Sequence, residues 1–226
     1  DTDSDGDGIP DDVERIVVLG ISHYTCPVPF SLTEKTFASP FGDVSTDPEA
    51  LQTLADSLPY DPKEGEIAHR LEHSIEIPLL LLQYAQPDLD VDLVPIICSF
   101  RREDEHETVL DGLADELRHL LDNPATYLIA GVDFAHMGPE FGDPEPLEEN
   151  DFESLEHHDR EMLKHLERAD AGEFEHHIQS DGNRRRVCGY PALRTILPLF
   201  DEGNTIHYDQ WQDPRETVTY GSLVMQ

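Results

Sequence analysis

Short apolar segments alternate with amphipathic ones along most of the chain. Apolar runs bounded by turn residues predict strands, and apolar residues repeating roughly every three to four positions predict helices. Asp47 and Pro48 indicate a helix start, because aspartate caps a first turn and proline fits its first position; Leu51, Leu54 and Leu58 then share one face. The pattern predicts strands at 15–20, 91–98, 125–132, 205–211 and 217–225, and helices starting at 48, at 74–84, 103–121, 147–168 and 172–178, and near 191.

This alternation of strands and helices is typical of an α/β fold. We predict an α/β sandwich in which helices flank a mixed central sheet. The 125–132 segment is almost wholly apolar, which indicates a strand in a sheet covered on both faces. The chain has no internal repeat. Its first dozen residues differ from the rest, so we divide it into an acidic leader at 1–13 and one α/β domain at 14–226.

Acidic side chains dominate the composition. The 226 residues include 49 Asp and Glu but only 15 Lys and Arg, which gives a formal net charge of −34. This charge excludes nucleic acids and anionic lipid surfaces as main partners, because both require clustered Lys and Arg. The basic clusters at 101–102 and 184–186 are too short for such a surface. A hydrophobic content of 38% is enough for a core and excludes a wholly disordered acidic tail.

Lysine is nearly absent, since Lys35, Lys63 and Lys164 are the complete set. An acidic, lysine-poor composition resembles that of halophilic proteins, whose hydrated carboxylates keep them soluble in brine; the alternative is an ordinary acidic protein. No apolar run approaches the roughly 20 residues of a membrane-spanning helix. The acidic start shows no secretory signal, so we expect a cytoplasmic protein, or an extracellular one if the leader binds calcium.

The leader places carboxylates at alternate positions around glycines. Calcium binds many oxygen ligands, and glycine permits the tight turn that gathers them. The segment resembles the acidic repeat of thrombospondin type 3 calcium modules and, more loosely, an EF-hand loop. Two interpretations stand: a calcium site, or a solvated acidic segment. The expected calcium ligands are Asp1, Asp3, Asp5, Asp7 and Asp11.

Two predicted strands end in histidine-bearing loops. His23 follows the strand at 15–20, and Asp133 and His136 follow the strand at 125–132. Ligands of open α/β sheets bind beyond the carboxyl ends of the strands, so a site is expected where these loops meet. Asp133 is close enough to His136 in sequence to orient it. A single such histidine would indicate a loop residue bonded to backbone, but the pair favours a site.

Cys188 is a further candidate. The other two cysteines are Cys26 and Cys98; an odd number at wide spacing excludes a disulfide framework and a CxxC zinc site. Cys188 follows three arginines and precedes a predicted helix, and both features should lower the pKa of its thiol. The alternative is a small buried apolar residue at a helix start. The arginines beside it could also bind a carboxylate or phosphate.

The segment 72–76 combines acidic, histidine and serine side chains. Ser74 can cap the following helix, which leaves His73 and Glu76 near its first turn. These two residues are either part of the capping arrangement or face a substrate. Two histidine pairs, 157–158 and 176–177, lie on acidic predicted helices. Neighbouring helical residues diverge by roughly 100°, so neither pair can chelate jointly, and we expect solvated helix faces.

Six short motifs together resemble one family. They are LGISH (19–23), SPFGD (39–43), EHSIE (72–76), VPI (94–96), DFAH (133–136) and CGYP (188–191). Their order and approximate spacing resemble those of the Memo family, whose prokaryotic members are called AmmeMemoRadiSam system protein B. The resemblance covers about residues 14–226.

The resemblance implies the fold of class III extradiol dioxygenases, which hold non-heme iron. In Memo proteins the corresponding cavity is similar, with a cysteine in place of a glutamate ligand; the matching residues here are His23, His136 and Cys188. Family members are connected with copper or iron and redox chemistry, and an animal member with cell motility and phosphotyrosine peptides. A further family histidine lies in an upstream Pro-His-Ala-Gly-Tyr motif that this sequence lacks, so we expect a sheet without its first strand and a weaker site.

We therefore predict a metal site formed by His23, His136 and Cys188 for iron or copper, with zinc as a further option. In this interpretation His73 and Asp133 are catalytic, orienting ligands or moving protons, and Arg186 and Glu76 bind substrate. The activity would be that of an oxidoreductase related to the extradiol dioxygenases. The alternative is a non-catalytic module that binds a peptide or small anion in the same cavity, and the third option is an intact but inactive relic.

Overall fold

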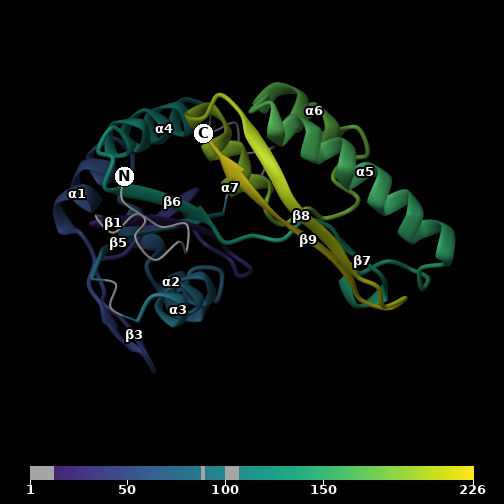
Figure 1. Cartoon of the computed structure of the whole chain (residues 1–226), viewed down its shortest axis with the longest axis horizontal. Helices are drawn as coiled ribbons and strands as arrows, with labels where there is room; N and C mark the ends of the chain where they lie inside the picture. The colour runs from purple at the N-terminus through teal and green to yellow at the C-terminus, as the bar shows by residue number, and fades with distance from the viewer. Residues whose placement is uncertain (1–12, 88–89, 100–106) are drawn as a thin grey trace. The chain divides into compact units, whose positions relative to one another are not determined.

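The computed structural model describes residues 13–87, 90–99 and 107–226 (Figure 1). The leader, with its predicted calcium ligands, lies outside the described residues. The chain divides into two compact units, Asp1–Gly131 (unit 1) and Val132–Gln226 (unit 2). None of the helices within the described ranges is long and apolar enough to cross a membrane.

Unit 1 is built on a four-stranded mixed sheet. Strands β1 (Arg15–Ile21), β2 (Phe30–Leu32), β5 (Asp92–Cys98) and β6 (Thr126–Ala130) lie in the order β2-β5-β1-β6. β1 runs parallel to β5 and β6, whereas β2 runs antiparallel to β5. A separate hairpin joins β3 (Phe37–Ser39) to β4 (Gly42–Val44). The predicted α/β fold with a mixed sheet flanked by helices is confirmed.

Helices cover both faces of this sheet. They are α1 (Pro48–Asp56), α2 (Ile67–Leu71), α3 (Glu76–Ala85) and α4 (Glu107–Leu121), with a 3₁₀ turn, η1, at Pro62–Gly65. Successive strand residues point to opposite faces. Ile16 and Val18 of β1 therefore share one core with Leu79 and Leu82 of α3, and Figure 1 shows α1 and α4 on the other side. Asp47 caps α1 through its carboxylate, as predicted.

Two details of unit 1 differ from the prediction. Ser74 does not cap α3, which starts at Glu76; instead its hydroxyl accepts from the N–H of Ile21 at 3.1 Å and donates to the Ile21 carbonyl at 2.9 Å. β6 is shorter than 125–132 and lies at the sheet edge, with four of its five residues only half-buried. An apolar sequence alone does not distinguish an edge strand from a central one.

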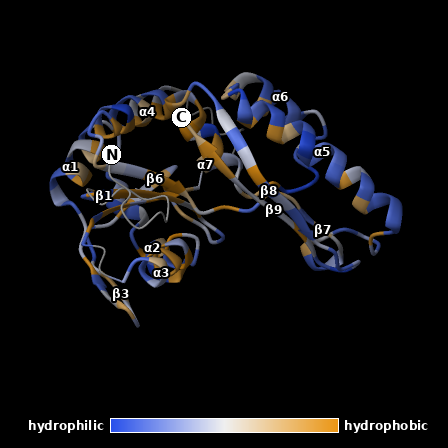
Figure 2. Ribbon diagram, in the orientation of Figure 1, coloured by the Kyte–Doolittle hydropathy of each residue, from blue (hydrophilic) through white to orange (hydrophobic). Residues whose placement is uncertain are grey.

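Unit 2 contains a second sheet and three helices. Strands β7 (His136–Met137), β9 (Thr217–Met225) and β8 (Gly203–Trp211) are antiparallel in that order. The helices are α5 (Glu149–Glu167), α6 (Ala171–Gln179) and α7 (Tyr190–Ile196), with 3₁₀ turns η3 at Pro139–Phe141 and η4 at Leu197–Leu199. The two predicted closing strands thus form a sheet of their own. Figure 2 shows that α5 is mostly hydrophilic, with a narrow apolar stripe.

Candidate metal centre

Three potential ligands of unit 1 meet beyond the carboxyl end of β1. His23, Glu72 and His73, hereafter the unit 1 cluster, have donor atoms within 4.8 Å of one another. Nδ1 of His23 lies 2.7 Å from Oε2 of Glu72, whose side chain is only 1% exposed. The backbone N–H of His23 donates to the other Glu72 oxygen. The His73 ring stacks on that of His23, with ring centroids 4.8 Å apart.

This pairing determines the chemistry of His23. A buried carboxylate accepts the Nδ1 proton, so the neutral imidazole carries its lone pair on Nε2. That tautomer is the one a metal ligand needs. Gly20 and Ser74 hold the strand end that presents His23: a Cβ at Gly20 would lie 2.4 Å from the Ser74 hydroxyl oxygen, so only glycine allows this close approach.

A second group of ligands lies in unit 2. Asp133, His136 and Cys188, hereafter the unit 2 cluster, also have donor atoms within 4.8 Å of one another. The backbone N–H groups of Cys188 and Gly189 donate to the carbonyls of Phe134 and Asp133 at 3.1 and 3.0 Å. The Cys188 thiol lies 3.4 Å from the Asp133 carbonyl oxygen. A Cβ at Gly189 would be 2.7 Å from that oxygen, so glycine permits the contact between the two segments.

His136 is held by backbone on both sides. It pairs with Val218 across β7 and β9, and its N–H donates to the Arg185 carbonyl at 2.7 Å. Its Nδ1 lies 3.3 Å from the Phe134 carbonyl, and its ring meets the edge of Phe141 at 5.0 Å. The carbonyl can only accept, so Nδ1 is the donor of this hydrogen bond and the lone pair of the neutral ring lies on Nε2, as in His23.

Arg186 and Asp143 form a bidentate ion pair next to His136. Nη2 and Nη1 of Arg186 lie 2.7 and 3.2 Å from the two Asp143 oxygens, and Nη1 also donates to the His136 carbonyl at 3.2 Å. The guanidinium lowers the pKa of Asp143. Arg186 has a φ of 52°, a left-handed conformation uncommon outside glycine. In this arrangement the predicted substrate residue Arg186 fixes the loop that carries His136.

The predicted activation of Cys188 by the neighbouring arginines is wrong. Burial, followed by the charge of Asp133, raises the pKa of the Cys188 thiol to about 12. Arg185 is buried and bonded to Asp159 at 3.3 Å and Asp181 at 2.9 Å. Internal carboxylates therefore balance two of the three arginines. The sequence alone does not show this, because both Asp159 and Asp143 are distant from Cys188 in sequence.

Unit 1 also contains a cavity of about 660 Å³. Its wall includes the predicted substrate residue Glu76, at the exposed start of α3, together with Glu72. His69 lines it as well, buried, with Nε2 bonded to the Ser31 carbonyl at 3.0 Å and Nδ1 without a partner among the described residues. Lys35 and Lys63, two of the three lysines of the chain, lie on the same wall.

The predicted ligands are thus distributed over both units. His136 and Cys188 lie together with Asp133 in unit 2, and His23 lies with His73 in unit 1. That His23 joins His136 and Cys188 on one ion stays a prediction. The sequence analysis missed Glu72 and Asp143 as supporting residues. Glu72 directly precedes the nominated His73, which could have identified it, whereas nothing in the local sequence identifies Asp143.

Comparison with known proteins matches nearly the whole chain, across both units, to one family. Residues 8–224 match the family described as Memo-like protein. A MEMO1 family protein of Aquifex aeolicus is 28% identical over 218 residues, covering 93% of this chain and 55% of the relative. A second, from Thermus thermophilus, is 33% identical over 190 residues, covering 84% and 54%. The chain spans about half the length of these curated relatives. Because the family match extends over almost all of its residues, the chain belongs to the Memo-like family.

Proposed function

We propose that this Memo-like chain binds a redox-active transition metal, iron or copper, through His23, His136 and Cys188, with zinc as a third option. The observation that carries the proposal is the unit 2 cluster, in which an imidazole, a thiol and a carboxylate have donor atoms within 4.8 Å of one another. Ligands from separate loops, with space for water or substrate, are typical of catalytic rather than structural metal sites.

The donor set fits these metals. Imidazole nitrogen suits iron, copper and zinc, and thiolate sulfur favours copper and zinc over hard cations such as magnesium. The Cys188 thiol is protonated at neutral pH, since burial raises its pKa to about 12. A bound cation favours the thiolate, so binding at Cys188 would release a proton.

The surrounding residues have defined supporting roles in this proposal. Glu72 fixes the tautomer of His23, and the Phe134 carbonyl does the same for His136. His73 stacks on His23, where it can hold or transfer a proton, and Asp133 lies beside the Cys188 sulfur. Iron or copper held here would supply one-electron chemistry towards oxygen and a small aromatic or thiol substrate. We therefore propose an oxidoreductase.

A second candidate function is a non-catalytic binding module. The unit 1 cavity supports it, because its wall combines charged side chains of both signs with apolar ones. Lys35, Lys63 and Arg70 line it together with four glutamates, Glu64, Glu66, Glu72 and Glu76, and Lys63 pairs with Glu34 at 2.7 Å. Phe37 and Leu80 add apolar wall. A peptide or small organic anion with an apolar body would pair its negative charge with Lys35 and Arg70 while its apolar part leaves water.

Metal analysis of purified variants tests the first proposal. Wild-type protein and His136→Ala, Cys188→Ser and His157→Ala would be loaded with Fe²⁺ or Cu⁺ without oxygen, dialysed and analysed. We expect His136→Ala and Cys188→Ser each to hold about one equivalent less than wild type, with unchanged circular dichroism. His157 is exposed, so its variant should match wild type. Equal metal content in wild type and His136→Ala would contradict the proposal.

An oxygen-consumption assay then separates the two functions. The loaded wild-type protein is expected to consume oxygen with thiol or catechol-type substrates, and the Cys188→Ser protein to be inactive. Three results together would favour the binding module. They are equal metal content in wild type and the His136→Ala and Cys188→Ser variants, no oxygen consumption, and a measurable affinity for small organic anions that Lys35→Gln removes.

A further inference from the structure

Helix α3 is apolar on its outer side as well as on its core side. Leu79 and Leu82 are buried in the core of unit 1. Ile77, Leu81 and Tyr84 are exposed and, because they follow one another at spacings of four and three residues, share the opposite side of the helix. Figure 2 shows this helix mainly in the hydrophobic colours. A helix that is hydrophobic all round is typically covered on all sides, which indicates that the outer side of α3 contacts a partner.

Neighbouring segments extend this apolar surface. Phe41 lies in the turn between β3 and β4, and its ring centroid is 6.1 Å from that of Tyr84. Ile67 and Leu71 lie one helical turn apart on α2, and Ile67 shares a cavity wall with Leu80 of α3. Six side chains, hereafter the α2–α3 face, are each between 48% and 72% exposed: Phe41, Ile67, Leu71, Ile77, Leu81 and Tyr84.

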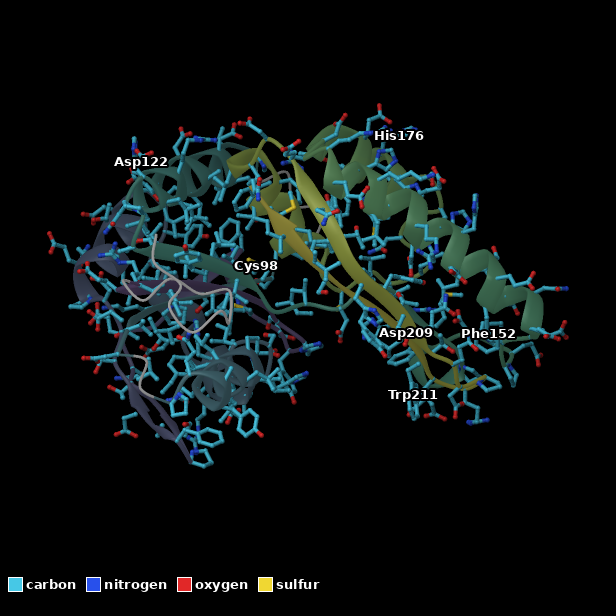
Figure 3. The ribbon with its side chains drawn as sticks, in the orientation of Figure 1. Cys98, Asp122, Phe152, His176, Asp209 and Trp211 are labelled. Carbon is cyan, nitrogen blue, oxygen red and sulfur yellow. The ribbon has the colours of Figure 1, made fainter. Side chains whose placement is uncertain are left out.

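Other helices present charged or polar residues to solvent. The outer side of α4 carries exposed carboxylates such as Asp115. The solvated faces expected for the two histidine pairs are confirmed for His157 and His176, which are exposed, and wrong for His158 and His177, which are half-buried. Figure 3 shows His176 at the outer side of α6. The α2–α3 face, which has no charged member, thus differs from the solvated helix surfaces of this acidic chain.

We propose that the α2–α3 face is the contact between two copies of this chain related by a two-fold axis. Its six side chains expose roughly 600–800 Å², close to the about 800 Å² that each partner contributes to a standard interface. An exposed apolar patch of more than a few hundred Å² usually marks an interaction site. The contact lies wholly within unit 1 and contains none of the proposed metal ligands.

The charges of the chain are consistent with a pair of identical copies. Two chains of net charge −34 repel each other, and an uncharged contact keeps like charges out of the interface itself. The rim of the face has both signs, since Arg70 adjoins Leu71, Glu76 adjoins Ile77, and both charged residues are exposed. Across a two-fold axis a surface meets itself, so a cation on the rim of one copy can face a carboxylate on the rim of the other.

The chain's own remaining segments are poor candidates for covering this face. Residues 1–12 and 100–106, which lie outside the described residues, include one large apolar side chain each, Ile9 and Phe100. Six exposed apolar side chains require a comparable apolar area on the partner, and a second α2–α3 face supplies it.

Sedimentation equilibrium of the full chain tests the proposal. In molar potassium chloride, which screens the repulsion between copies, we expect wild-type protein to dimerise with a dissociation constant on the order of micromolar. Leu81→Asp, Tyr84→Asp and Ile67→Asp each place a carboxylate on the face and should raise that constant roughly 30-fold or more. Ile206→Asp is the matched control, because Ile206 of β8 is 62% exposed and Leu81 63%. Its dissociation constant should equal that of wild type.

Circular dichroism verifies that each variant is folded, and the salt dependence gives a second measurement. The dimer should dissociate in dilute buffer, where the repulsion between the acidic copies is unscreened. Wild-type protein that stays monomeric at about 100 μM in molar salt would overturn the proposal, as would a dimer that the three face variants leave unchanged or that Ile206→Asp weakens equally. A monomer that instead floats with neutral phosphatidylcholine vesicles would overturn it too, and would assign the face to a lipid surface.

Discussion

The imidazole Nδ1 of His23 is hydrogen-bonded to Oε2 of Glu72 at 2.7 Å, at the carboxyl end of β1. Glu72 is almost completely buried, and both of its oxygens bond to His23. A buried carboxylate needs such partners, and the imidazole gains a fixed orientation in return. Glu72 is therefore a positioning residue for His23.

Replacing Glu72 by Gln should weaken metal binding by roughly 10–100-fold. The amide cannot act as an acceptor of comparable strength, so the His23 ring loses its preferred tautomer. Calorimetric titration with the metal gives the affinity, and circular dichroism verifies the fold. The exposed carboxylate Glu49, at the first turn of α1, provides the control, since Glu49→Gln should bind as wild type. Unchanged affinity in Glu72→Gln would show that His23 is not oriented through this contact.

The Arg186–Asp143 pair should stabilise the loop that carries His136. We expect Arg186→Ala and Asp143→Asn each to lower the free energy of unfolding by about 1–2 kcal/mol, with a coupling of about 1 kcal/mol in the double variant. Urea unfolding of the four proteins measures the cycle. Both single variants should also retain less metal, because His136 loses the Arg186 contact to its carbonyl. Strictly additive effects on unfolding would mean that the ion pair contributes nothing.

His69 should make the stability of the chain depend on pH. Burial lowers its pKa from 6.5 to about 4. Above pH 6.5 His69 is neutral in both the folded and the unfolded chain, and the unfolding free energy has its full value. Between pH 6.5 and 4 only the unfolded chain binds the proton, so the unfolding free energy falls as the pH falls. The complete loss is roughly 3 kcal/mol.

The variant His69→Gln isolates this contribution, since its amide can still donate to the Ser31 carbonyl. From pH 7 to pH 5, wild type should lose about 2 kcal/mol more unfolding free energy than the variant, measured by urea unfolding. The exposed His119→Gln protein should follow wild type. Parallel pH profiles for wild type and His69→Gln would contradict the assignment.

Salt should stabilise the whole chain. A formal net charge of −34 causes strong self-repulsion in dilute buffer. Molar potassium chloride screens charges within a few ångströms, so the melting temperature should rise steadily between dilute buffer and molar salt. Differential scanning calorimetry measures it. A constant or falling melting temperature would count against a halophilic adaptation.

Local pattern was sufficient to predict most elements. β1 and β5 are buried along nearly their whole length, so their sequences are continuous apolar runs. The start of α1 has both a capping aspartate and a proline, a combination with little ambiguity. The short strands β2 and β7 were missed, because strands of three and two residues carry no periodicity and form only by pairing with β5 and β9.

The candidate site was predictable only in its ligands. Histidines leaving buried strands identified His23 and His136, and a cysteine before a helix identified Cys188. The electrostatics were not predictable, since they depend on contacts between distant segments. Arg185 meets Asp159 from α5, and Arg186 meets Asp143 from the loop after η3. Sequence proximity suggested that these arginines act on Cys188, but the fold pairs them with carboxylates.

The most direct test of the central claim is whether Cys188 ligates the metal. Co²⁺ bound by a thiolate gives an intense near-ultraviolet charge-transfer band that nitrogen and oxygen ligands do not produce. Titration of the reduced wild-type protein without oxygen should produce this band, and the half-buried Cys26→Ser protein should retain it. The band should be absent from the Cys188→Ser protein and weakened in His136→Ala. A band of equal intensity in Cys188→Ser, or cobalt bound to wild type without the band, would contradict a metal site at Cys188.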